Sequence, residues 1–594
     1  MSKIDIISKV KNPFLYKIDY LNIQSLITDF QKIEKKSKKI NYKKNIKLSI
    51  SSDYTSDYLT EFLPIFFANK GIKAEIYQKE YGSLNFISKD PKNSFWKKNN
   101  DFFILIPSSK NLNLPLVTDK IKDIKKKAQK DSKTWLRLWN SVDKKIIQTT
   151  FEPTSYPYLG EVDAIKYGGY LHYVRLVNSI LSENKPQNVH LIDIENLVFR
   201  NQKANWNDVK MYNLTKQPFS METIPFLSNY ISNAVSGMLG MSKKAIVVDL
   251  DNTLWGGIVG DDGAKNIILG PETVAGEAFQ NFQIYLKQLT EKGIVLCVCS
   301  KNDEKIAKKA FLENKNMILK LQDITIFKSN FLDKAANIKD ISKILNIGLD
   351  SLIFVDDSKF ECDQVKKTLP DVLTINLSED PSDFIKIVDE SSAFYFDNIT
   401  KEDILRVSSY KKISKINDDM KESKNIDDFL KSINSKVIIE KIKKDNSERS
   451  SQLLAKTNQF KFNSKTFLPK DLISKNSFCI FYEDKYQNYG NIGVVIYKII
   501  KNQHLILENW VLSCRVFSRR LEFLIIKHLL TKAKDSNCKY LLFKFEKTNK
   551  NIYLQEFLQT LNIKINKKKQ LYKINIKDIK VINLKNYIEL KKWK

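Results

Sequence analysis

Two aspartates lie directly after an apolar run, in a pattern that suits phosphoryl transfer. Asp249 and Asp251 follow the apolar residues 245–248, and Thr253 comes two residues later. On an extended chain, side chains two residues apart point the same way, so both carboxyl groups can face one reacting atom. One carboxylate can then attack phosphorus in line and form an aspartyl-phosphate, while its neighbour handles the proton of the leaving group.

Two facing carboxylates would repel a dianionic phosphate, so such a site needs cations. Asp356 and Asp357 end another apolar run and can help to hold Mg²⁺, which prefers oxygen ligands. Ser300 closes the run "VLCVCS" and can donate a hydrogen bond to a phosphoryl oxygen. Lys334 can neutralise charge on the nucleophile and the phosphate. An acidic pair after a strand is also often a turn or cap, but four such elements in order favour a phosphate site.

The spacing of these residues predicts an open site. Ser300 follows Asp251 by 49 residues, and Lys334 follows Ser300 by 34 residues. Neither interval has room for a cap domain in addition to its own helix and strand. An open site suits a phosphate carried on a large partner, or closure by another domain of the chain.

A parallel α/β sheet must position these side chains, because such sheets deliver polar residues at the carboxyl ends of buried strands. Apolar runs separated by helical segments predict the strands of this sheet at residues 244–248, 293–299, 324–328, 351–355 and 372–375.

The remaining sequence divides into regions of different texture. We expect a lysine-rich extension over residues 1–45, an α/β domain over 46–240 and the phosphatase-type domain over 241–400. A charged, helical connector follows over 401–435. Residues 436–594 show sequential strands, then a helix and another strand, which predicts an α+β domain.

Composition excludes several classes of protein. The net charge is +30, but only eight of the 98 basic residues are arginines, so the excess is lysine. Arginine is the usual residue for reading phosphates and bases, and a nucleic-acid partner is therefore not expected. The six cysteines show no metal-ligand spacing, and no apolar run reaches the length of a membrane span. We expect a cytoplasmic protein with reduced thiols.

The four polar elements resemble the motifs of the haloacid dehalogenase superfamily. "DLDNT" is similar to its first motif, Ser300 to its second, Lys334 to its third and "DDS" to its fourth, with Lys328 as an alternative third-motif lysine. The resemblance implies that Asp249 is the nucleophile and Asp251 the acid/base, with Mg²⁺ as cofactor. It also implies metal ligands at Asp249, Asp251 and Asp356, and substrate contacts at Thr253 and Asn302.

Longer motifs resemble the FkbH-like proteins, a capless branch (IIIC) of that superfamily. They are "VVDLDNTLWGGIVGDDG", "SKNDE", "LNIGLDSLIFVDDS", "LLAKTNQF" and "SCRVFSRRLE". The resemblance implies a phosphatase that takes an activated glyceryl donor, 1,3-bisphosphoglycerate, and places the acyl group on an acyl carrier protein. Such carriers are typically acidic, and a basic surface would speed their docking.

The C-terminal region is similar to GCN5-type (GNAT) acyltransferases, which bind a pantetheine pyrophosphate at a glycine-rich turn opening a helix. Here Ser518 and Arg520 occupy that turn, so coenzyme A binding is in doubt. Arg515, Arg519 and Arg520 could instead dock a phosphopantetheine arm. Cys514 is a candidate acyl-carrying thiol, although an ordinary cysteine at a strand end is the alternative.

The N-terminal domain resembles an SGNH-hydrolase fold. Ser51, Ser52 and Asp53 follow its first strand, where the nucleophile of such an enzyme would lie. None of the four histidines, however, follows an aspartate by three residues, so no triad of that pattern can form. We therefore expect a scaffold or docking surface.

Three hypotheses remain open. The first is a Mg²⁺-dependent phosphatase coupled to acyl transfer from an acyl phosphate to an acyl carrier protein. The second keeps only the phosphatase, acting on a sugar or carrier-bound phosphate, with a C-terminal domain that only binds. The third is a non-catalytic scaffold, which the acidic motifs disfavour because converging carboxylates are costly to retain without a metal.

Overall fold

The computed structural model divides the chain into two compact units, Met1–Met238 and Leu239–Lys594. It describes residues 20–36, 40, 42–153, 157–201, 204–395, 401–422, 425–500, 503–517, 519–548, 550–561, 564–566, 571–576 and 588–591. The expected α/β class is confirmed, because the described residues form three sheets, two of them built only of parallel strands. None of the described helices is long and apolar enough to cross a membrane.

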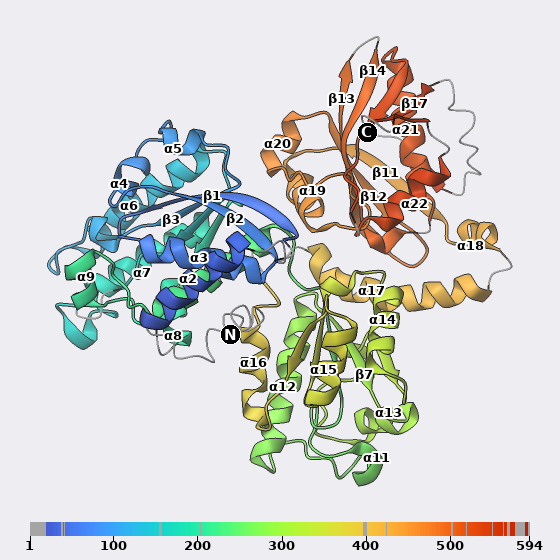
Figure 1. Cartoon of the computed structure of the whole chain (residues 1–594), viewed down its shortest axis with the longest axis horizontal. Coiled ribbons are helices and arrows are strands. Elements are labelled where there is room, and N and C mark those ends of the chain that lie inside the picture. The colour runs from blue at the N-terminus through green and yellow to red at the C-terminus, as the bar shows by residue number, and fades with distance from the viewer. Residues whose placement is uncertain are drawn as a thin grey trace. The chain divides into compact units, whose positions relative to one another are not determined.

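The first unit is a parallel sheet with strand order β2-β1-β3-β4-β5 (Figure 1). Its strands are β1 (Lys44–Ser52), β2 (Ile72–Gln78), β3 (Phe102–Ile106), β4 (Ile146–Thr149) and β5 (Val189–Ile192). Its helices are α2 (Tyr20–Lys36), α3 (Asp57–Asn69), α4 (Leu84–Ile87), α5 (Ser94–Lys97), α6 (Ile121–Ser141), α7 (Tyr170–Asn184), α8 (Ile194–Arg200), α9 (Val209–Thr215) and α10 (Thr223–Met238). Helices α6 and α7 pack on each other and share a core with β3 and β4, while α3 packs on α10.

The second unit begins with another parallel sheet, which we call the central domain. Its strand order is β10-β9-β6-β7-β8. The strands are β6 (Ala245–Val248), β7 (Val295–Ser300), β8 (Ile326–Ser329), β9 (Leu352–Asp356) and β10 (Leu373–Asn376). The helices are α11 (Val259–Asp262), α12 (Val274–Glu291), α13 (Glu304–Glu313), α14 (Lys334–Leu345), α15 (Lys359–Thr368) and α16 (Phe384–Glu390).

Alternation along the central strands creates two cores, one on each face of the sheet. Ile246 and Val248 of β6 pack with the apolar face of α12, whereas Ala245 and Val247 pack with α14 and α15. Every residue of β6, β7 and β9 is buried between these cores, and these three strands are apolar up to their ends. In these three strands the first polar side chains therefore appear where the strand ends, and the parallel strands end at the same edge.

The third sheet, the C-terminal domain, is mixed and has eight strands in the order β16-β17-β15-β14-β13-β12-β11-β18. They are β11 (Ser435–Lys441), β12 (Ser477–Glu483), β13 (Asn488–Ile500), β14 (His504–Leu512), β15 (Tyr540–Phe543), β16 (Lys564–Asn566), β17 (Leu571–Asn575) and β18 (Ile588–Lys591). Helices α21 (Leu521–Asp535) and α22 (Ile552–Thr560) cover one face, and α19 (Lys444–Lys456) and α20 (Pro469–Ser474) cover the other.

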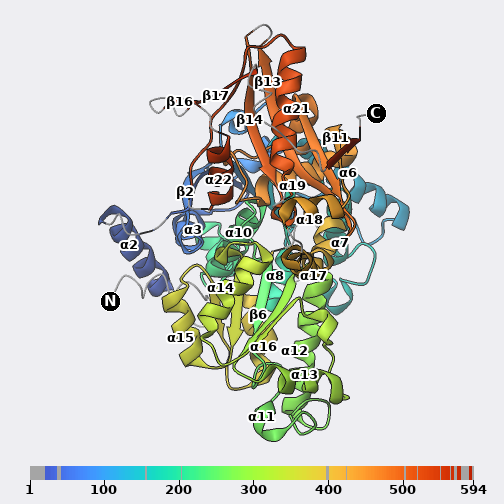
Figure 2. The same ribbon diagram turned by 90° about the vertical axis from the view of Figure 1, so that its right-hand side faces the viewer.

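Helices α17 (Lys401–Glu422) and α18 (Ile426–Ser432) connect the central and C-terminal domains within the second unit. Arg406 Nη1 of α17 donates to the carbonyl of Gly293 in the central domain (3.0 Å), and Lys412 Nζ donates to the carbonyl of Tyr486 in the C-terminal domain (3.0 Å). In two perpendicular views, α17 lies at one end of the central domain and α11 at the other (Figures 1 and 2).

We expect acid to destabilise the C-terminal domain through His528. This half-buried side chain of α21 packs edge-on against the ring of Phe478, and its Nε2 has no hydrogen-bond partner in the described residues. Burial and, secondarily, Lys532 lower the pKa of His528 from 6.5 to about 4. The unfolded chain therefore binds the proton more tightly, and stability is lost as the pH falls from about 6.5 towards 4, by up to about 3 kcal/mol.

Urea unfolding of the wild type and of His528→Leu at pH 7.5 and 4.5 measures this loss. The midpoint of the C-terminal transition should fall less in the variant than in the wild type, with His504→Leu as the control for loss of a histidine from the same domain. An equal pH dependence in wild type and His528→Leu would contradict the assignment.

Candidate active site

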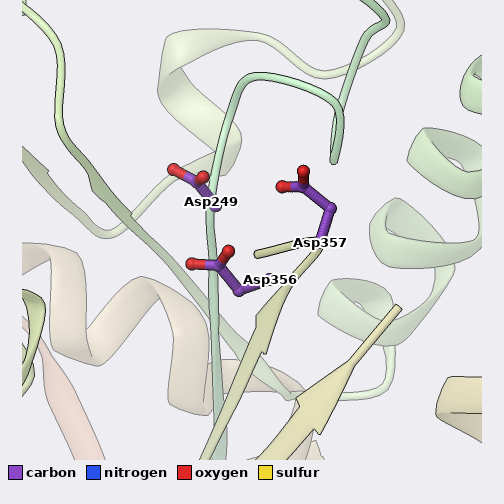
Figure 3. A group of neighbouring side chains, drawn as sticks. All are labelled: Asp249, Asp356 and Asp357. Atoms are coloured by element: carbon purple, nitrogen blue, oxygen red, sulfur yellow. The ribbon is translucent and has the colours of Figure 1, made fainter. Parts of the chain in front are cut away.

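A buried lysine lies between two aspartates at the carboxyl edge of the central sheet. Lys334 Nζ is 2.9 Å from Asp249 Oδ2 and 2.7 Å from Asp356 Oδ2. All three side chains are buried, and Asp357 is half-buried beside them. The carboxylate oxygens of Asp249, Asp356 and Asp357 lie within 4.8 Å of one another and surround a common space (Figure 3). Residues from three separate motifs thus meet at one point.

The pairing of the strands brings these groups together. β6 and β9 are adjacent and parallel, with Val248 opposite Val355, so Asp249 and Asp356 leave the sheet side by side. Lys334 is the first residue of α14, whose N-terminus is capped by Asp333 accepting from the backbone N–H of Ala335. The helix therefore begins where β8 has just ended, and its first side chain reaches the two aspartates.

The charges at this point favour a divalent cation. Burial, and then the Asp249 carboxylate, raise the pKa of Asp356 to about 7, against the opposing effect of Lys334. Burial opposes the charge on Lys334, but Asp249 and Asp356 together raise its pKa. Asp249 Oδ1 is buried and has no hydrogen-bond partner among the described residues. Three carboxylates and one ammonium leave two negative charges, and a Mg²⁺ ion held by oxygens would balance them. The residues present fit this ion.

The side chain of Asp251 lies outside this group of carboxylates, and its place in the metal set stays a prediction. The strand β6 ends at Val248, and a turn follows in which Asn252 has φ 52° and Gly257 has φ 91°. The φ of Gly257 is one that residues with side chains rarely adopt, so the turn favours glycine there. The spacing rule for an extended chain therefore does not apply to Asp251.

The turn gives Asp251 its own hydrogen bonds. Its Oδ1 accepts from Trp255 Nε1 (2.9 Å) and from the backbone N–H of Val259 (3.0 Å), and its Oδ2 accepts from Asn302 Nδ2 (2.7 Å). Three donors hold the carboxylate in one orientation beside the cluster. This arrangement suits a group that handles a proton. The Asp251 carboxylate is not one of the converging carboxylates. Asp357 supplies the third carboxylate of the converging group. The sequence indicates this residue through the pair "DD", in which Asp357 follows Asp356.

The same edge carries three further predicted residues, namely Ser300, Asn302 and Thr253. Ser300 ends β7, and its Oγ accepts from Asn302 Nδ2 at 3.2 Å, so the serine is linked to Asp251 through Asn302. Thr253 Oγ1 donates to Asp357 Oδ1 at 3.2 Å. Lys328, the alternative motif lysine, instead pairs with Asp340 (2.6 Å) away from this group.

The predicted arginines of the C-terminal domain do not form a cluster open to an anionic arm. Arg519 is only 6% exposed and pairs with the buried Asp484 (Nε to Oδ2, 3.2 Å). Its Nη2 also donates to Tyr489 Oη at 2.9 Å. Arg515 is buried, whereas Arg520 is half-exposed and pairs with Asp427 at 2.8 Å. Ser518 lies outside the described residues. The sequence could place these arginines together but could not tell that two of them point inward.

Cys514 lies far from the aspartate cluster. It packs against the core that lies under α14, and its Sγ is 3.6 Å from the hydroxyl of Tyr410. Its carbonyl accepts from Asn346 Nδ2 (3.3 Å), just beyond the end of α14. Lys334 begins that helix, and its twelve residues span about 18 Å. Cys514 therefore lies at the opposite end of the central domain from Asp249.

The chain itself takes up the edge of β14 beyond its pairing with β15. The two strands pair in parallel only from His504 to Leu507. Further along, the backbone N–H of Phe462 donates to the Trp510 carbonyl (3.1 Å), and that of Leu512 donates to the Phe460 carbonyl (3.1 Å). An extended ligand therefore cannot add to this part of β14 as a new strand without displacing residues 460–462.

In the first unit, the hydroxyls at the end of β1 have internal partners, and the predicted position of Ser51 and Ser52 after the strand is wrong because β1 extends through Ser52. Ser51 Oγ lies 3.1 Å from Ser83 Oγ, and Ser52 Oγ accepts from the backbone N–H of Tyr54. Asp53 accepts from the backbone N–H of Ser108 and from Asn111. These partners include no histidine.

Comparisons with known proteins give a family match to the first unit and a similar solved structure with a phosphatase domain. Residues 47–236 match the family model of the FkbH N-terminal domain. The N-terminal part of a Bacteroides fragilis protein, containing a phosphatase domain complexed with Mg, is 26% identical with a TM-score of 0.57, over 63% of this chain and 99% of that one. No curated protein matches the chain.

Two solved structures show much weaker likeness. Ard1 from Thermoplasma volcanium is 9% identical over 23% of this chain and 94% of that one, with a TM-score of 0.18. The N-acetylglutamate synthase of Neisseria gonorrhoeae, complexed with coenzyme A and L-arginine, is 9% identical over 58% and 98%, also at 0.18. At such scores neither carries an argument about this chain.

Proposed function

Because this chain is an FkbH-like protein with a haloacid-dehalogenase-type phosphatase domain, we propose that it removes phosphate through an aspartyl-phosphate and couples this step to acyl transfer. The observation that carries the proposal is the buried contact of Lys334 with both Asp249 and Asp356, beside an Asp249 oxygen that has no partner among the described residues.

The protein side chains divide the work of phosphate removal. Asp249 attacks phosphorus, a new O–P bond forms, and the bond from phosphorus to the leaving oxygen breaks. Asp251, oriented by Trp255 and Asn302, gives that oxygen its proton and later takes one from the water that hydrolyses the aspartyl-phosphate. Lys334 and Ser300 face the charge of the transferred group.

The side chains of Asp249, Asp356 and Asp357 would hold Mg²⁺, and Asp251, the third residue of the set predicted from the sequence, lies beside them. When bound, Mg²⁺ would neutralise phosphate charge and orient the phosphoryl group for in-line attack. Lys334 would hold Asp249 in position for that attack.

The chemistry of a bisphosphate donor assigns a separate phosphate to each step. Attack of Asp249 on the phosphorus of an acyl phosphate would release a free carboxylate, and the activation of the acyl group would be lost. Asp249 therefore acts on the ester phosphate. In the acyl step, a thiolate forms a C–S bond with the acyl carbon, the C–O bond to the other phosphate breaks, and that phosphate leaves.

The thiol of the acyl step is the terminal thiol of a phosphopantetheine arm on an acyl carrier protein. Cys514 remains a proposed intermediate carrier. Its position at the far end of α14 from Lys334 means that an acyl group on Cys514 would have to travel between two sites. Direct transfer to the carrier thiol needs no such movement, and we favour it.

A stand-alone phosphatase is the second candidate, because residues 460–462 occupy the edge of β14 and Arg519 is paired internally. Incubation with Mg²⁺, 1,3-bisphosphoglycerate and carrier proteins encoded nearby distinguishes the candidates. A glyceryl adduct on a carrier, seen by mass spectrometry, supports coupled transfer, and phosphate without an adduct supports the phosphatase alone. The absence of both products would support the non-catalytic scaffold. Reactions without Mg²⁺ or without carrier are the controls.

A further inference from the structure

Two consecutive aspartates supply two of the three converging carboxylates, although an extended chain would point them apart. Neighbouring side chains on a strand point to opposite faces of the sheet. The oxygens of Asp356 and Asp357 nevertheless lie within 4.8 Å of each other and of Asp249, around one space (Figure 3). β9 ends at Asp356, Asp357 lies in a bend, and α15 begins at Lys359. The backbone must therefore be held in a set conformation at these two aspartates.

Electrostatic repulsion acts against this conformation. Burial, and then the Asp249 carboxylate, raise the pKa of Asp357 as well as that of Asp356. Without a cation, the like charges favour a rotation of both side chains away from Asp249. A site that already has its final shape binds its ligand at a lower cost of ordering, so the groups that resist this rotation should raise the affinity for Mg²⁺.

The side chain of Asn376 holds the backbone at both aspartates. Asn376 is the last residue of β10 and the register partner of Asp356 in the parallel pairing of β10 with β9. Its Nδ2 donates to the carbonyl of Asp357 at 2.7 Å and to the carbonyl of Asp356 at 3.2 Å. An amide nitrogen carries two N–H donors, so one side chain serves both carbonyls. The two hydrogen bonds tie consecutive peptide groups at the bend to the neighbouring strand.

Other contacts at the bend hold different atoms. The backbone N–H of Leu377 donates to the carbonyl of Asp356 (2.9 Å), and the backbone N–H of Ser358 donates to Asp356 Oδ1 (2.8 Å). Of these three groups, only the Asn376 amide contacts both Asp356 and Asp357. It does so through their carbonyls, so it occupies none of the carboxylate oxygens that a cation needs.

The ordinary role of such an amide is to satisfy carbonyl groups at the end of a strand. β10 is the outer strand of the sheet and Asn376 is half-buried, so water can reach this end of β10 and can satisfy carbonyl groups there. A side chain attached to β10 adds what water cannot, namely one fixed position for two consecutive peptide groups. Both of these peptide groups belong to residues of the carboxylate cluster.

We propose that Asn376 is a positioning residue of the Mg²⁺ site, whose amide fixes the backbone of Asp356 and Asp357 so that both carboxylates meet the ion together with Asp249. This rests on the Mg²⁺ site of the proposed function and adds a residue outside the four sequence motifs that predict that site. Asn376 acts through the two aspartates rather than by contact with the ion or the phosphate.

Titration calorimetry of Mg²⁺ into the full-length protein tests this role. Asn376→Leu keeps about the same size but removes both donors, and Asn376→Ser is too short to serve two carbonyls. Each variant should bind Mg²⁺ at least about 10-fold more weakly than the wild type, as is typical for loss of a group that orients metal ligands. Thr374→Val is the matched control, because Thr374 lies two residues earlier on β10 and its buried Oγ1 has no hydrogen-bond partner among the described residues.

Phosphatase kinetics and unfolding give two further readouts. Hydrolysis of p-nitrophenyl phosphate by Asn376→Leu should need about 10-fold more Mg²⁺ to reach half of its maximal rate, and the rate should recover as Mg²⁺ rises while the KM for the phosphate ester stays unchanged. Urea unfolding without Mg²⁺ measures any loss of stability separately. A purely structural residue would lower the unfolding midpoint and leave the Mg²⁺ dissociation constant of the folded protein unchanged.

Each outcome decides a different point. Equal Mg²⁺ affinity in the wild type and Asn376→Leu overturns the positioning role and leaves the proposed function intact. Equal weakening by Thr374→Val also overturns it, because the effect would then belong to β10 as a whole. If Asn376→Leu does not fold, Asn376→Ser decides by the same two comparisons. A wild type that binds no Mg²⁺ overturns the metal site of the proposed function itself.

Discussion

Replacing Asp249 with Asn should lower phosphate release by at least about 1000-fold, because an amide oxygen cannot form the aspartyl-phosphate. The expected loss is in kcat, measured as inorganic phosphate with 1,3-bisphosphoglycerate or p-nitrophenyl phosphate as substrate. Folding should be retained. Asn has nearly the same shape as Asp, and the change removes one of three crowded carboxylates around Lys334.

Two matched variants separate loss of the nucleophile from loss of metal affinity. Asp357→Asn removes a proposed Mg²⁺ ligand but keeps Asp249 and Lys334 in contact, so higher Mg²⁺ should restore much of its rate. Asp249→Asn should stay inactive at every Mg²⁺ concentration. Asp340→Asn removes an aspartate that pairs with Lys328 outside the site and should have wild-type kinetics. Phosphate release by Asp249→Asn at the wild-type rate would remove Asp249 as the nucleophile.

The sequence predicted the strands that carry the site closely, for a physical reason. A strand buried on both faces must be apolar along its whole length, and a polar residue then marks where it ends. The predicted strand 351–355 is β9 (Leu352–Asp356), and 293–299 is β7 (Val295–Ser300). In the first unit β4 (Ile146–Thr149) is hard to predict, because a run of four residues between lysines and threonines gives little pattern.

The composition of the site was predictable to the extent that it depends on strand ends. Asp249, Ser300 and Asp356 meet because adjacent parallel strands end together, and Lys334 joins them from the start of α14. The orientation of Asp251 was not predictable. It depends on a turn with a left-handed Asn252, on two donors within that turn and on one distant donor, Asn302.

The arginines of the C-terminal domain show a second limit. A run such as "RVFSRR" fixes which charges are close in sequence but not which side of the backbone each takes. Arg519 and Arg520 are neighbours, yet one is buried against Asp484 and the other is half-exposed beside Asp427. The left-handed conformation of Arg520, with φ 60°, turns the chain between them, and this cannot be read from residue types.

Loss of Arg519 should therefore destabilise the protein strongly. Arg519→Met would leave Asp484 buried without its counter-ion and would remove the donor to Tyr489, which should lower the free energy of unfolding of the C-terminal domain by about 3 to 5 kcal/mol. Asp484→Asn should be costly as well, and the double variant should cost less than the sum of the two because neither charge then remains unpaired. Urea denaturation measures all three values.

Arg520→Met is the control, because it removes the adjacent arginine and a pair with Asp427 that is partly open to solvent. It should cost less than about 1 kcal/mol. The comparison also separates a structural from a ligand-binding role for Arg519. If Arg519 served mainly to bind a phosphopantetheine arm, Arg519→Met would weaken carrier binding while the unfolding free energy stayed at the wild-type value. A loss of stability in Arg519→Met that Arg520→Met does not share would instead assign Arg519 to the framework, because only a buried ion pair makes removal of one partner so costly.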